Sequence, residues 1–322
     1  MEELLKVRNL NVGFLVGRKE TQVLRNVDFF VKEKEILGVI GETGCGKSVT
    51  GSAILRLLPD NAVIHGEIFY KGQDILKMGE EKFRTMRGSE ISAIPQSPGT
   101  SLNPMMKIGD QITECLVHQK TDKKEAKEQV FHIFEKLHLP ADESFFRKYP
   151  WELSGGMCQR VLIGMGMITH ARFLVVDEPT KAIDWALRKD VAAILKSLKM
   201  DMGCSMLMIT HDIAVASAIA DRIAVMYCGQ IVEIGETREV LKHPQHPYTK
   251  GLIDSMPSRG FHVMKGFMPA FGELTEACSF YDRCPQAGEA CKKAQEFIKT
   301  ESGHLVRCNR CGKDVERKER TL

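Results

Sequence analysis

The chain has 322 residues, of which 43% are hydrophobic and 27% charged, a composition typical of a soluble globular protein with an ample core. Its 45 basic and 42 acidic residues leave a net charge of +3, which is too balanced to indicate nucleic-acid binding on electrostatic grounds. Apolar runs such as residues 161–168 are far shorter than the ~18 residues of a membrane span. The opening MEELLKVRNLNV lacks the apolar core of a signal peptide, so we expect a cytosolic protein whose membrane role is peripheral.

The N-terminal forty residues predict three short strands. These are LLKVRNLNV (4–12), VLRNVDFFV (23–31) and EILGVIG (35–41), and the third is a continuous apolar run typical of a strand buried on both faces. A glycine-rich loop follows it directly. After the loop, the apolar residues of VTGSAILRLLP (49–59) share one helical face until Pro59 ends the helix.

Helices dominate the prediction for residues 100–165, and strands return afterwards. Asp122 and Glu125 resemble a capping box in front of an apolar stripe that ends before Pro140. RFLVVDEP (172–179) and CSMLMITHD (204–212) read as buried strands, and RIAVMYCGQIVEIG (222–235) reads as a hairpin turning at Cys228-Gly229. This alternation predicts an α/β protein with a mainly parallel sheet. Composition shifts near residue 243, where HPQHPY begins.

The string GETGCGKS (41–48) fits the phosphate-loop pattern G-x-x-x-x-G-K-[ST]. Its glycines let the backbone wrap closely around phosphate, and the following helix N-terminus adds positive potential. Lys47 supplies a charge for the β- and γ-phosphates, and Ser48 supplies a hydroxyl for Mg²⁺. The alternative is a chance glycine-rich turn, which the strand before and the helix after argue against. The predicted nucleotide contacts are Gly41, Glu42, Thr43, Gly44, Cys45, Gly46, Lys47, Ser48 and Val49.

A second candidate phosphate-recognition element lies at Ser154, Gly155 and Gly156, just before a helix predicted over about 157–169. A serine hydroxyl, two glycines and a helix N-terminus together suit an anion. SGG alone would indicate only a helix cap after a turn. One chain has little use for two such elements on one nucleotide.

Taken together, GETGCGKS, LSGGMCQR (153–160) and FLVVDEP (173–179) resemble the ATP-binding subunits of ABC transporters, which are ATPases. The resemblance implies a RecA-like P-loop core with an antiparallel β subdomain and a helical subdomain, plus a small cysteine-rich C-terminal extension. We expect a nucleotide-binding domain over 1–242, its helical subdomain over about 97–165, and the extension over 243–322.

Two acidic residues end the strand FLVVD. Asp177 can face a phosphate-bound Mg²⁺, and Glu178 is the natural general base or orienter for the attacking water. By resemblance, His211 is the switch histidine that senses the γ-phosphate, and Gln96 is the Q-loop residue that reaches Mg²⁺ and the water. Phe14 matches the aromatic that stacks on adenine, although a strand-end aromatic can equally be packing. The implied Mg²⁺ ligands are Ser48, Gln96 and Asp177.

In the resembled family, two subunits pair head to tail, so that the Ser154–Gly156 element of one caps the nucleotide of the other. Two departures from the family pattern occur in this chain. Cys158 stands where Arg is common, and KAID (181–184) followed by Trp185 differs from the usual D-loop, although Asp184 remains. These changes bear on communication across the dimer more than on hydrolysis.

The remaining strings narrow the resemblance to importers of oligopeptides, dipeptides and nickel. SLNP (101–104) lies where the coupling helix of a membrane subunit docks, and HPYTKGLIDSMP (246–257) resembles the distinctive tail of that subfamily. The implied partners are two membrane-spanning permease subunits, a sister ABC ATPase and, indirectly, an external solute-binding protein, with no nucleic acid. The implied location is the cytoplasmic face of the cell membrane.

Five of the ten cysteines crowd the last 45 residues. By resemblance, Cys278, Cys284, Cys291 and Cys308 hold a [4Fe–4S] cluster. The spacing itself leaves alternatives open, because four thiolates also suit Zn²⁺ and Cys311 forms a C-x-x-C pair with Cys308. Unoccupied thiols are the third possibility.

These features are compatible with three functions. The leading prediction is the ATP-hydrolysing subunit of an importer for peptides, nickel or related small solutes, with ATP and Mg²⁺ as cofactors. The alternative is a soluble ABC ATPase of DNA repair or translation, although such proteins typically carry two cassettes or long insertions. The third is a regulatory, redox-sensing protein that uses the cluster as its signal.

Overall fold

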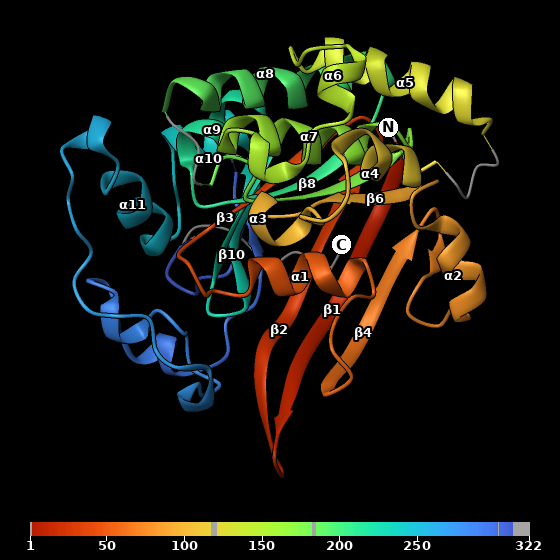
Figure 1. Ribbon diagram of the computed structural model, residues 1–322. Coiled ribbons are helices and arrows are strands. Elements are labelled where there is room, and N and C mark those ends of the chain that lie inside the picture. Colours follow the sequence, from red (N-terminus) through yellow and green to blue (C-terminus); the bar gives the residue numbers. More distant parts are fainter. Residues whose placement is uncertain (1, 117–120, 182–184, 302, 312–322) are drawn as a thin grey trace. The chain divides into compact units, whose positions relative to one another are not determined.

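The computed structural model of the chain describes residues 2–116, 121–181, 185–301 and 303–311 (Figure 1). The chain forms two compact units. The first comprises residues 1–32, 37–77 and 209–322, and the second comprises residues 33–36 and 78–208. Within the described ranges, no helix is both long enough and apolar enough to cross a membrane.

An antiparallel sheet begins the first unit. Its strands are β1 (Glu3–Val16), β2 (Lys19–Lys32), β4 (Ala62–Tyr70) and β5 (Gln73–Asp74), in the order β2-β1-β4-β5. Residues Leu5, Val7, Leu10 and Val12 of β1 are buried, and so is the alternating set Val27, Phe29 and Val31 of β2. The two predicted strands are therefore confirmed and extend further than expected, because β1 and β2 continue as a long hairpin ribbon that is visible in Figure 1.

A second run of strands in the first unit has the order β11-β12-β10-β9-β3. The buried strand β3 (Ile36–Ile40) pairs in parallel with β9 (Arg222–Tyr227), and β9 pairs antiparallel with β10 (Gln230–Glu236). Cys228 and Gly229 form the two-residue turn between β9 and β10 with φ of 43° and 73°. Positive φ at both positions is the requirement of a type I′ hairpin turn, so the predicted hairpin is confirmed.

Helices α1 (Lys47–Ile54) and α9 (Ile213–Ile219) follow the buried strands β3 and β8 (Ser205–Thr210) along the chain. Gly38 in β3 allows α9 and its C-cap residue to approach closely, because a Cβ at that position would lie 3.7 Å from the Cβ of Ala216 and 3.1 Å from the Cβ of Ala220. The carboxyl end of β3 thus leads directly into the glycine-rich loop, as the strand–loop–helix pattern predicted.

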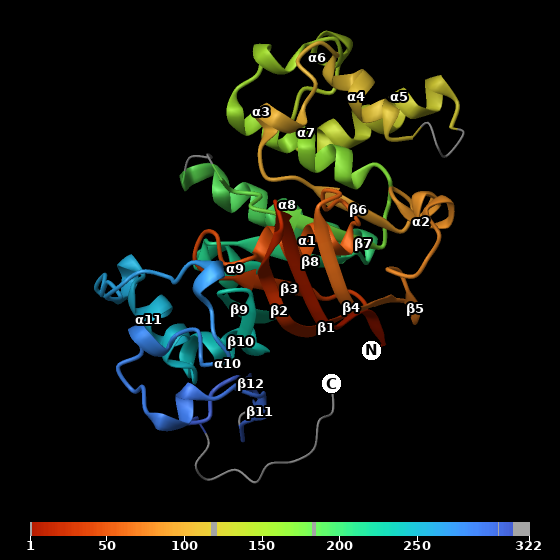
Figure 2. The ribbon, with the colours of Figure 1, turned by 90° about the horizontal axis from the view of Figure 1, so that it is seen from below.

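The second unit combines parallel strands with a group of helices. β6 (Ile91–Ile94) and β7 (Phe173–Asp177) pair in parallel, and β8 lies beside β7. Figure 2 shows the helices that gather away from these strands. They are α3 (Pro98–Ser101), α4 (Ile108–Glu114), α5 (Lys123–Lys136), α6 (Glu143–Phe146) and α7 (Gly155–Met167), and the unit also contains α2 (Glu80–Met86) and α8 (Trp185–Met202).

The group of helices is held together by an aromatic and aliphatic core. Helix α5 begins at Asp122, whose carboxylate accepts a hydrogen bond from the Lys124 N–H at 2.9 Å, so the predicted helix start is confirmed. Its buried stripe includes Val130 and Phe134, and Phe134 meets Phe145 of α6 edge to face at 5.0 Å between ring centroids.

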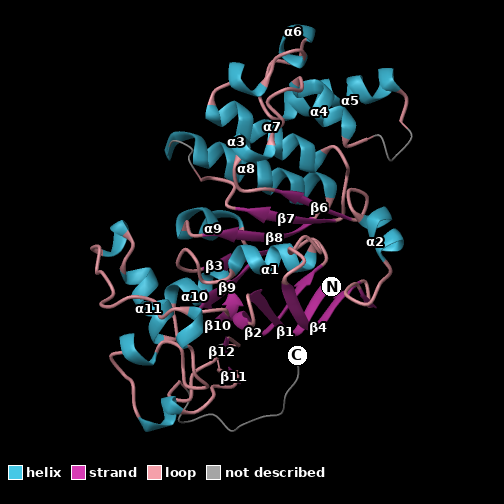
Figure 3. Cartoon of the chain, turned by 60° about the horizontal axis from the view of Figure 1, so that its bottom comes forward, coloured by secondary structure: helices cyan, strands magenta, loops and turns pink. Residues whose placement is uncertain are grey.

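The polypeptide after β10 is mostly short helices and loops (Figure 3). Its described residues form α10 (Thr237–Lys242), α11 (Pro247–Asp254) and the short strands β11 (Ile298–Lys299) and β12 (Leu305–Val306). They also form 3₁₀ turns at Pro257–Arg259, Phe271–Glu273, Tyr281–Arg283 and Glu289–Lys292. The fully buried Glu233 of β10 organises this region. Its carboxylate accepts the N–H groups of Gln245 and His246 at 2.9 Å each and lies 3.1 Å from Nδ1 of His304.

Candidate functional site

The glycine-rich loop has the backbone geometry of an anion-binding turn. Gly46 caps α1 with φ of 107°, and a Cβ there would lie 2.8 Å from Cδ2 of Leu24. At Gly41 a Cβ would lie 2.2 Å from the carbonyl oxygen of Met226, so no side chain fits without moving the backbone. The loop is therefore packed tightly on one side against β9, while Thr43, Gly44 and Ser48 remain exposed.

Lys47 spans this loop from the first turn of α1. Its side chain is 95% buried, and Nζ donates hydrogen bonds to the carbonyl oxygens of Gly41 and Glu42, both at 2.9 Å. The first turn of α1 contains no acidic residue, so its N-terminal N–H groups and the ammonium form one positive region beside the exposed Ser48. The loop, ammonium and hydroxyl fit the phosphates of a nucleotide.

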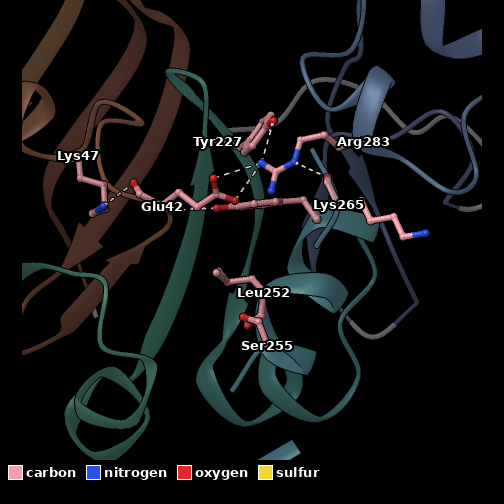
Figure 4. A network of polar contacts seen from close by, with 8 residues as sticks. Glu42, Lys47, Tyr227, Leu252, Ser255, Lys265 and Arg283 are labelled. Atoms are coloured by element: carbon pink, nitrogen blue, oxygen red, sulfur yellow. Dashed lines mark hydrogen bonds and ion pairs between the residues drawn. The ribbon is translucent and has the colours of Figure 1, made fainter. Parts of the chain in front are cut away.

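Two residues of the first unit were not singled out by the sequence and contact this loop. The guanidinium of Arg283 lies 3.0 Å and 3.1 Å from the carboxylate oxygens of Glu42, and the Glu42 N–H donates to the Tyr248 hydroxyl at 3.0 Å. Figure 4 shows the Glu42 side chain directed toward Arg283, with Lys47 bound to the other side of the Glu42 residue. The HPY string contains Tyr248, but nothing in the local pattern connects it to a loop 200 residues away.

His211 and Phe14 are also in the first unit. His211 follows the end of β8 and is exposed, and the next residue, Asp212, caps α9 by accepting the N–H groups of Ala214 and Val215 at 3.0 and 3.2 Å. Phe14 lies in β1 between Thr21 of β2 and Ala62 of β4, and its ring is half-buried, outside the fully buried core. Both positions leave part of the side chain accessible.

In the second unit, the parallel pairing of β6 and β7 brings three predicted site residues to one edge. Ile94 pairs with Val176, so Gln96 lies just after the carboxyl end of β6, and Asp177 and Glu178 lie at the carboxyl end of the neighbouring parallel strand β7. Glu178 is 95% buried and has φ of 47°, a left-handed conformation that costs energy for a residue with a side chain. Such an edge is where ligands bind in parallel α/β sheets. Amide and carboxylate oxygens are among the ligands that Mg²⁺ prefers, so the chemistry of Gln96 and Asp177 fits that ion. The hydroxyl of Ser48, in the first unit, is by its own chemistry also a suitable Mg²⁺ ligand.

The second phosphate-recognition candidate is a capped helix start. The Ser154 hydroxyl accepts the Met157 N–H at 3.3 Å, and helix α7 begins at Gly155, two residues earlier than predicted. Ser154 and Gly155 are exposed. Cys158 is buried in the next turn with its sulfur 3.4 Å from the carbonyl oxygen of Pro150, and burial raises the pKa of this thiol. A neutral thiol thus occupies the position where the family commonly has a cation. Asp184 lies outside the described residues.

The C-terminal cysteines require a correction. Within the described part of the chain, no group of three or more His, Cys, Asp or Glu side chains is arranged to hold a metal ion. Burial raises the pKa of the Cys278 thiol to about 11 and also raises the pKa of Cys284, whereas a hydrogen bond with Cys311 lowers the pKa of Cys308 to about 6. Because no such group is found among the described residues, the predicted [4Fe–4S] cluster is wrong, and the zinc alternative has no support there. The four cysteines do line one pocket together: Cys278, Cys284, Cys291 and Cys308.

Comparisons with known proteins bear on the same regions. Residues 24–181 match the family described as ABC transporter, and residues 232–291 match the family described as oligopeptide/dipeptide transporter, C-terminal region. The dipeptide transport ATP-binding protein DppD of Bacillus subtilis is 36% identical over 318 residues, which cover 96% of this chain and 95% of that protein. The oligopeptide transport ATP-binding protein OppD of Salmonella typhimurium is 36% identical over 311 residues, with coverage of 95% and 93%.

Among solved structures, a dimeric ATP-binding cassette in a post-hydrolysis state, bound to ADP and Pi, has a similar fold. Its TM-score is 0.65 at 24% identity, over 73% of this chain and 99% of that chain. The fold is thus that of an ATP-binding cassette, and the chain is an ATPase of that class. It belongs to the ABC transporter family, in the group of dipeptide and oligopeptide transport ATP-binding proteins. These relatives are transport proteins, so they support the transport prediction over a soluble ATPase of DNA repair or translation.

Proposed function

We propose that this chain is the ATP-hydrolysing subunit that energises an importer of dipeptides or oligopeptides. The observation that carries the proposal is the region after β10, which matches the C-terminal region of oligopeptide and dipeptide transporters over residues 232–291. Relatives named for peptide transport align over nearly the whole chain and favour peptides over nickel or other small solutes. We also propose a nucleotide-binding domain over residues 1–242, with a helical subdomain over about 97–165, and a C-terminal extension over residues 243–322.

The proposed chemistry assigns one task to each side chain. The N–H groups of the glycine-rich loop, the N-terminus of α1 and Lys47 bind the phosphates, and Phe14 stacks on the adenine. Bound Mg²⁺ would neutralise phosphate charge, with Ser48, Gln96 and Asp177 as its protein ligands.

Hydrolysis requires a water in line with the γ-phosphate. Glu178 accepts a proton from that water, and its buried, left-handed position at the end of β7 fixes where the carboxylate acts. His211 donates a hydrogen bond to the γ-phosphate. Because His211 directly precedes the N-cap of α9, this contact connects the γ-phosphate to the start of that helix.

A partner cassette completes the proposed cycle. The exposed Ser154 and Gly155 at the start of α7 present a hydroxyl and helix N–H groups that suit the γ-phosphate held by another subunit. We propose that this other subunit is a sister ATPase and that Asp184 lies at the shared interface.

The remaining proposed partners are two membrane-spanning permease subunits, with an external solute-binding protein acting indirectly. The segment at residues 101–104, next to α3, would receive a cytosolic helix of a permease subunit. The chain would then act at the cytoplasmic face of the cell membrane.

Purification of the assembled complex tests this function. We expect the tagged chain to co-purify with two multi-span subunits and a second ATPase, and to show ATPase activity that rises with a peptide-loaded binding protein. The Glu178→Gln variant should assemble equally well and lose the stimulated activity, whereas Glu81→Gln, an exposed control in α2, should retain it. Stable binding of nucleic acid without membrane subunits would instead support the soluble-ATPase alternative.

A further inference from the structure

Glu42 is the second residue of the phosphate loop, and its carboxylate is a negative charge inside an element that must bind a more negative ligand. Because like charges repel, an uncompensated carboxylate at this position would weaken ATP binding. The side chain is 28% exposed, so the surrounding water screens its charge only in part. The way in which the protein compensates this charge therefore affects the ATP site.

Arg283, which is 241 residues further along the chain, provides the compensation. Its Nη1 lies 3.0 and 3.1 Å from the two carboxylate oxygens of Glu42 and 3.3 Å from the Tyr227 hydroxyl, and its Nε donates to the Lys265 carbonyl oxygen at 3.2 Å. The Arg283 side chain is only 7% exposed. Its guanidinium also lies over the rings of Tyr227 and Phe280, at 5.6 and 5.8 Å from the centroids. Several independent contacts thus fix the cation in one place.

The main chain of Glu42 is held by the same C-terminal region. Its N–H donates to the hydroxyl of Tyr248, which is fully buried and packs on Tyr227 with ring centroids 4.5 Å apart. Burial raises the pKa of the Tyr248 hydroxyl, so it stays neutral and adds no negative charge. A Cβ on Gly44 would lie 3.7 Å from Cε of Met268, so this region also reaches the exposed part of the loop.

We propose that Arg283 is a positioning residue for ATP binding, which neutralises Glu42 and holds its carboxylate away from the phosphates. Figure 4 shows the geometry, with the carboxylate directed to Arg283 and Lys47 on the opposite side. The affinity of the loop for ATP then depends on the C-terminal region, although that region is not part of the phosphate-loop motif. This inference requires only ATP binding and is independent of the peptide cargo proposed above.

Binding of a fluorescent ATP analogue to the full chain tests the proposal, with KM and kcat for ATP measured in parallel. We expect Arg283→Ala to raise Kd and KM by about fivefold to tenfold and to leave kcat within about twofold. Glu42→Gln should bind ATP at least as tightly as the wild type. The double variant Glu42→Gln/Arg283→Ala should return to near wild-type affinity, because the repelling charge is gone. Added NaCl should reduce the difference in Kd between Arg283→Ala and the wild type, because salt screens the repulsion.

Two variants serve as controls. Lys292→Ala removes an exposed ion pair with Glu289 in the same region and should not change the Kd for ATP. Arg283→Lys keeps the charge and should lie between the wild type and Arg283→Ala. If Arg283 only held the structure together, Glu42→Gln and the double variant would instead bind ATP as weakly as Arg283→Ala. That result, or an unchanged Kd in folded Arg283→Ala, would overturn the proposal, and Glu42→Gln alone decides it if Arg283→Ala does not fold.

Discussion

Replacement of the buried His246 by Asn should flatten the acid dependence of stability. The ring is about 1% exposed, and its Nδ1 accepts the Tyr248 N–H at 3.1 Å, which caps α11. An Asn side-chain oxygen can accept the same hydrogen bond but does not titrate in this range. The substitution therefore removes the ionisable group and retains the helix cap.

The magnitude follows from the environment of the ring. Burial lowers the pKa of His246 from its ordinary 6.5 to about 4; the buried Glu233 opposes this shift, and Lys250 adds to it. A group with a lower pKa in the folded state resists protonation there, so stability is complete above pH 6.5 and falls as the pH drops toward 4. The full loss is roughly 3 kcal/mol, because each pKa unit corresponds to about 1.4 kcal/mol.

Urea unfolding between pH 7.5 and pH 4.5, followed by circular dichroism, measures the effect. His246→Asn should be about 1–2 kcal/mol less stable at pH 7.5, since its ring also lies near Phe280, with centroids 6.0 Å apart. At pH 4.5 the wild type should have lost roughly 2 kcal/mol relative to the variant, so His246→Asn should be as stable as the wild type or slightly more stable. His243→Asn, an exposed control in the same HPQHPY string, should follow the wild type. A deficit that stays constant within about 0.5 kcal/mol over this range would refute the reasoning.

Three further predictions concern the nucleotide machinery. Gly46→Ala should lower the free energy of unfolding by about 1–3 kcal/mol, because φ is 107° and the new Cβ would lie 2.8 Å from Leu24. Gly79→Ala is the control: its φ is −58° and no atom lies near the added Cβ, so it should be nearly neutral in the same urea titration. Glu178→Gln should slow ATP hydrolysis by about 100-fold or more while ATP binding changes by less than about twofold; a smaller kinetic effect would argue against a general base. Ser154→Ala should cost about 1 kcal/mol through loss of the cap on Met157 and should reduce hydrolysis only when the partner subunit is present, which assays with and without that partner distinguish.

The sequence was informative wherever local backbone physics decides the structure. The glycine spacing of residues 41–48 predicted a strand–loop–helix turn, and the observed φ values at Gly44 and Gly46 require glycine. The turn at Cys228-Gly229 was predictable because a two-residue hairpin needs positive φ at both positions. The start of α7 was predicted two residues late, because Gly155 and Gly156 after the Ser154 cap already belong to the helix.

Long-range contacts could not be predicted in the same way. The ion pair between Glu42 and Arg283 depends on how the chain after β10 folds back onto the phosphate loop, and no local periodicity encodes that path. The cysteine prediction failed for a related reason. The sequence shows which cysteines are present and how far apart they are along the chain. Whether their thiolates can bind one metal ion depends on burial and on their arrangement in space.

The central claim is that ATP hydrolysis by this chain drives peptide import, and uptake of a radiolabelled dipeptide or oligopeptide into proteoliposomes tests it most directly. Vesicles that contain the complete complex, the binding protein and internal ATP should accumulate peptide with the wild-type chain and with Glu81→Gln. Glu178→Gln should reduce uptake to the level seen without ATP. Undiminished accumulation with the Glu178→Gln chain would contradict the account.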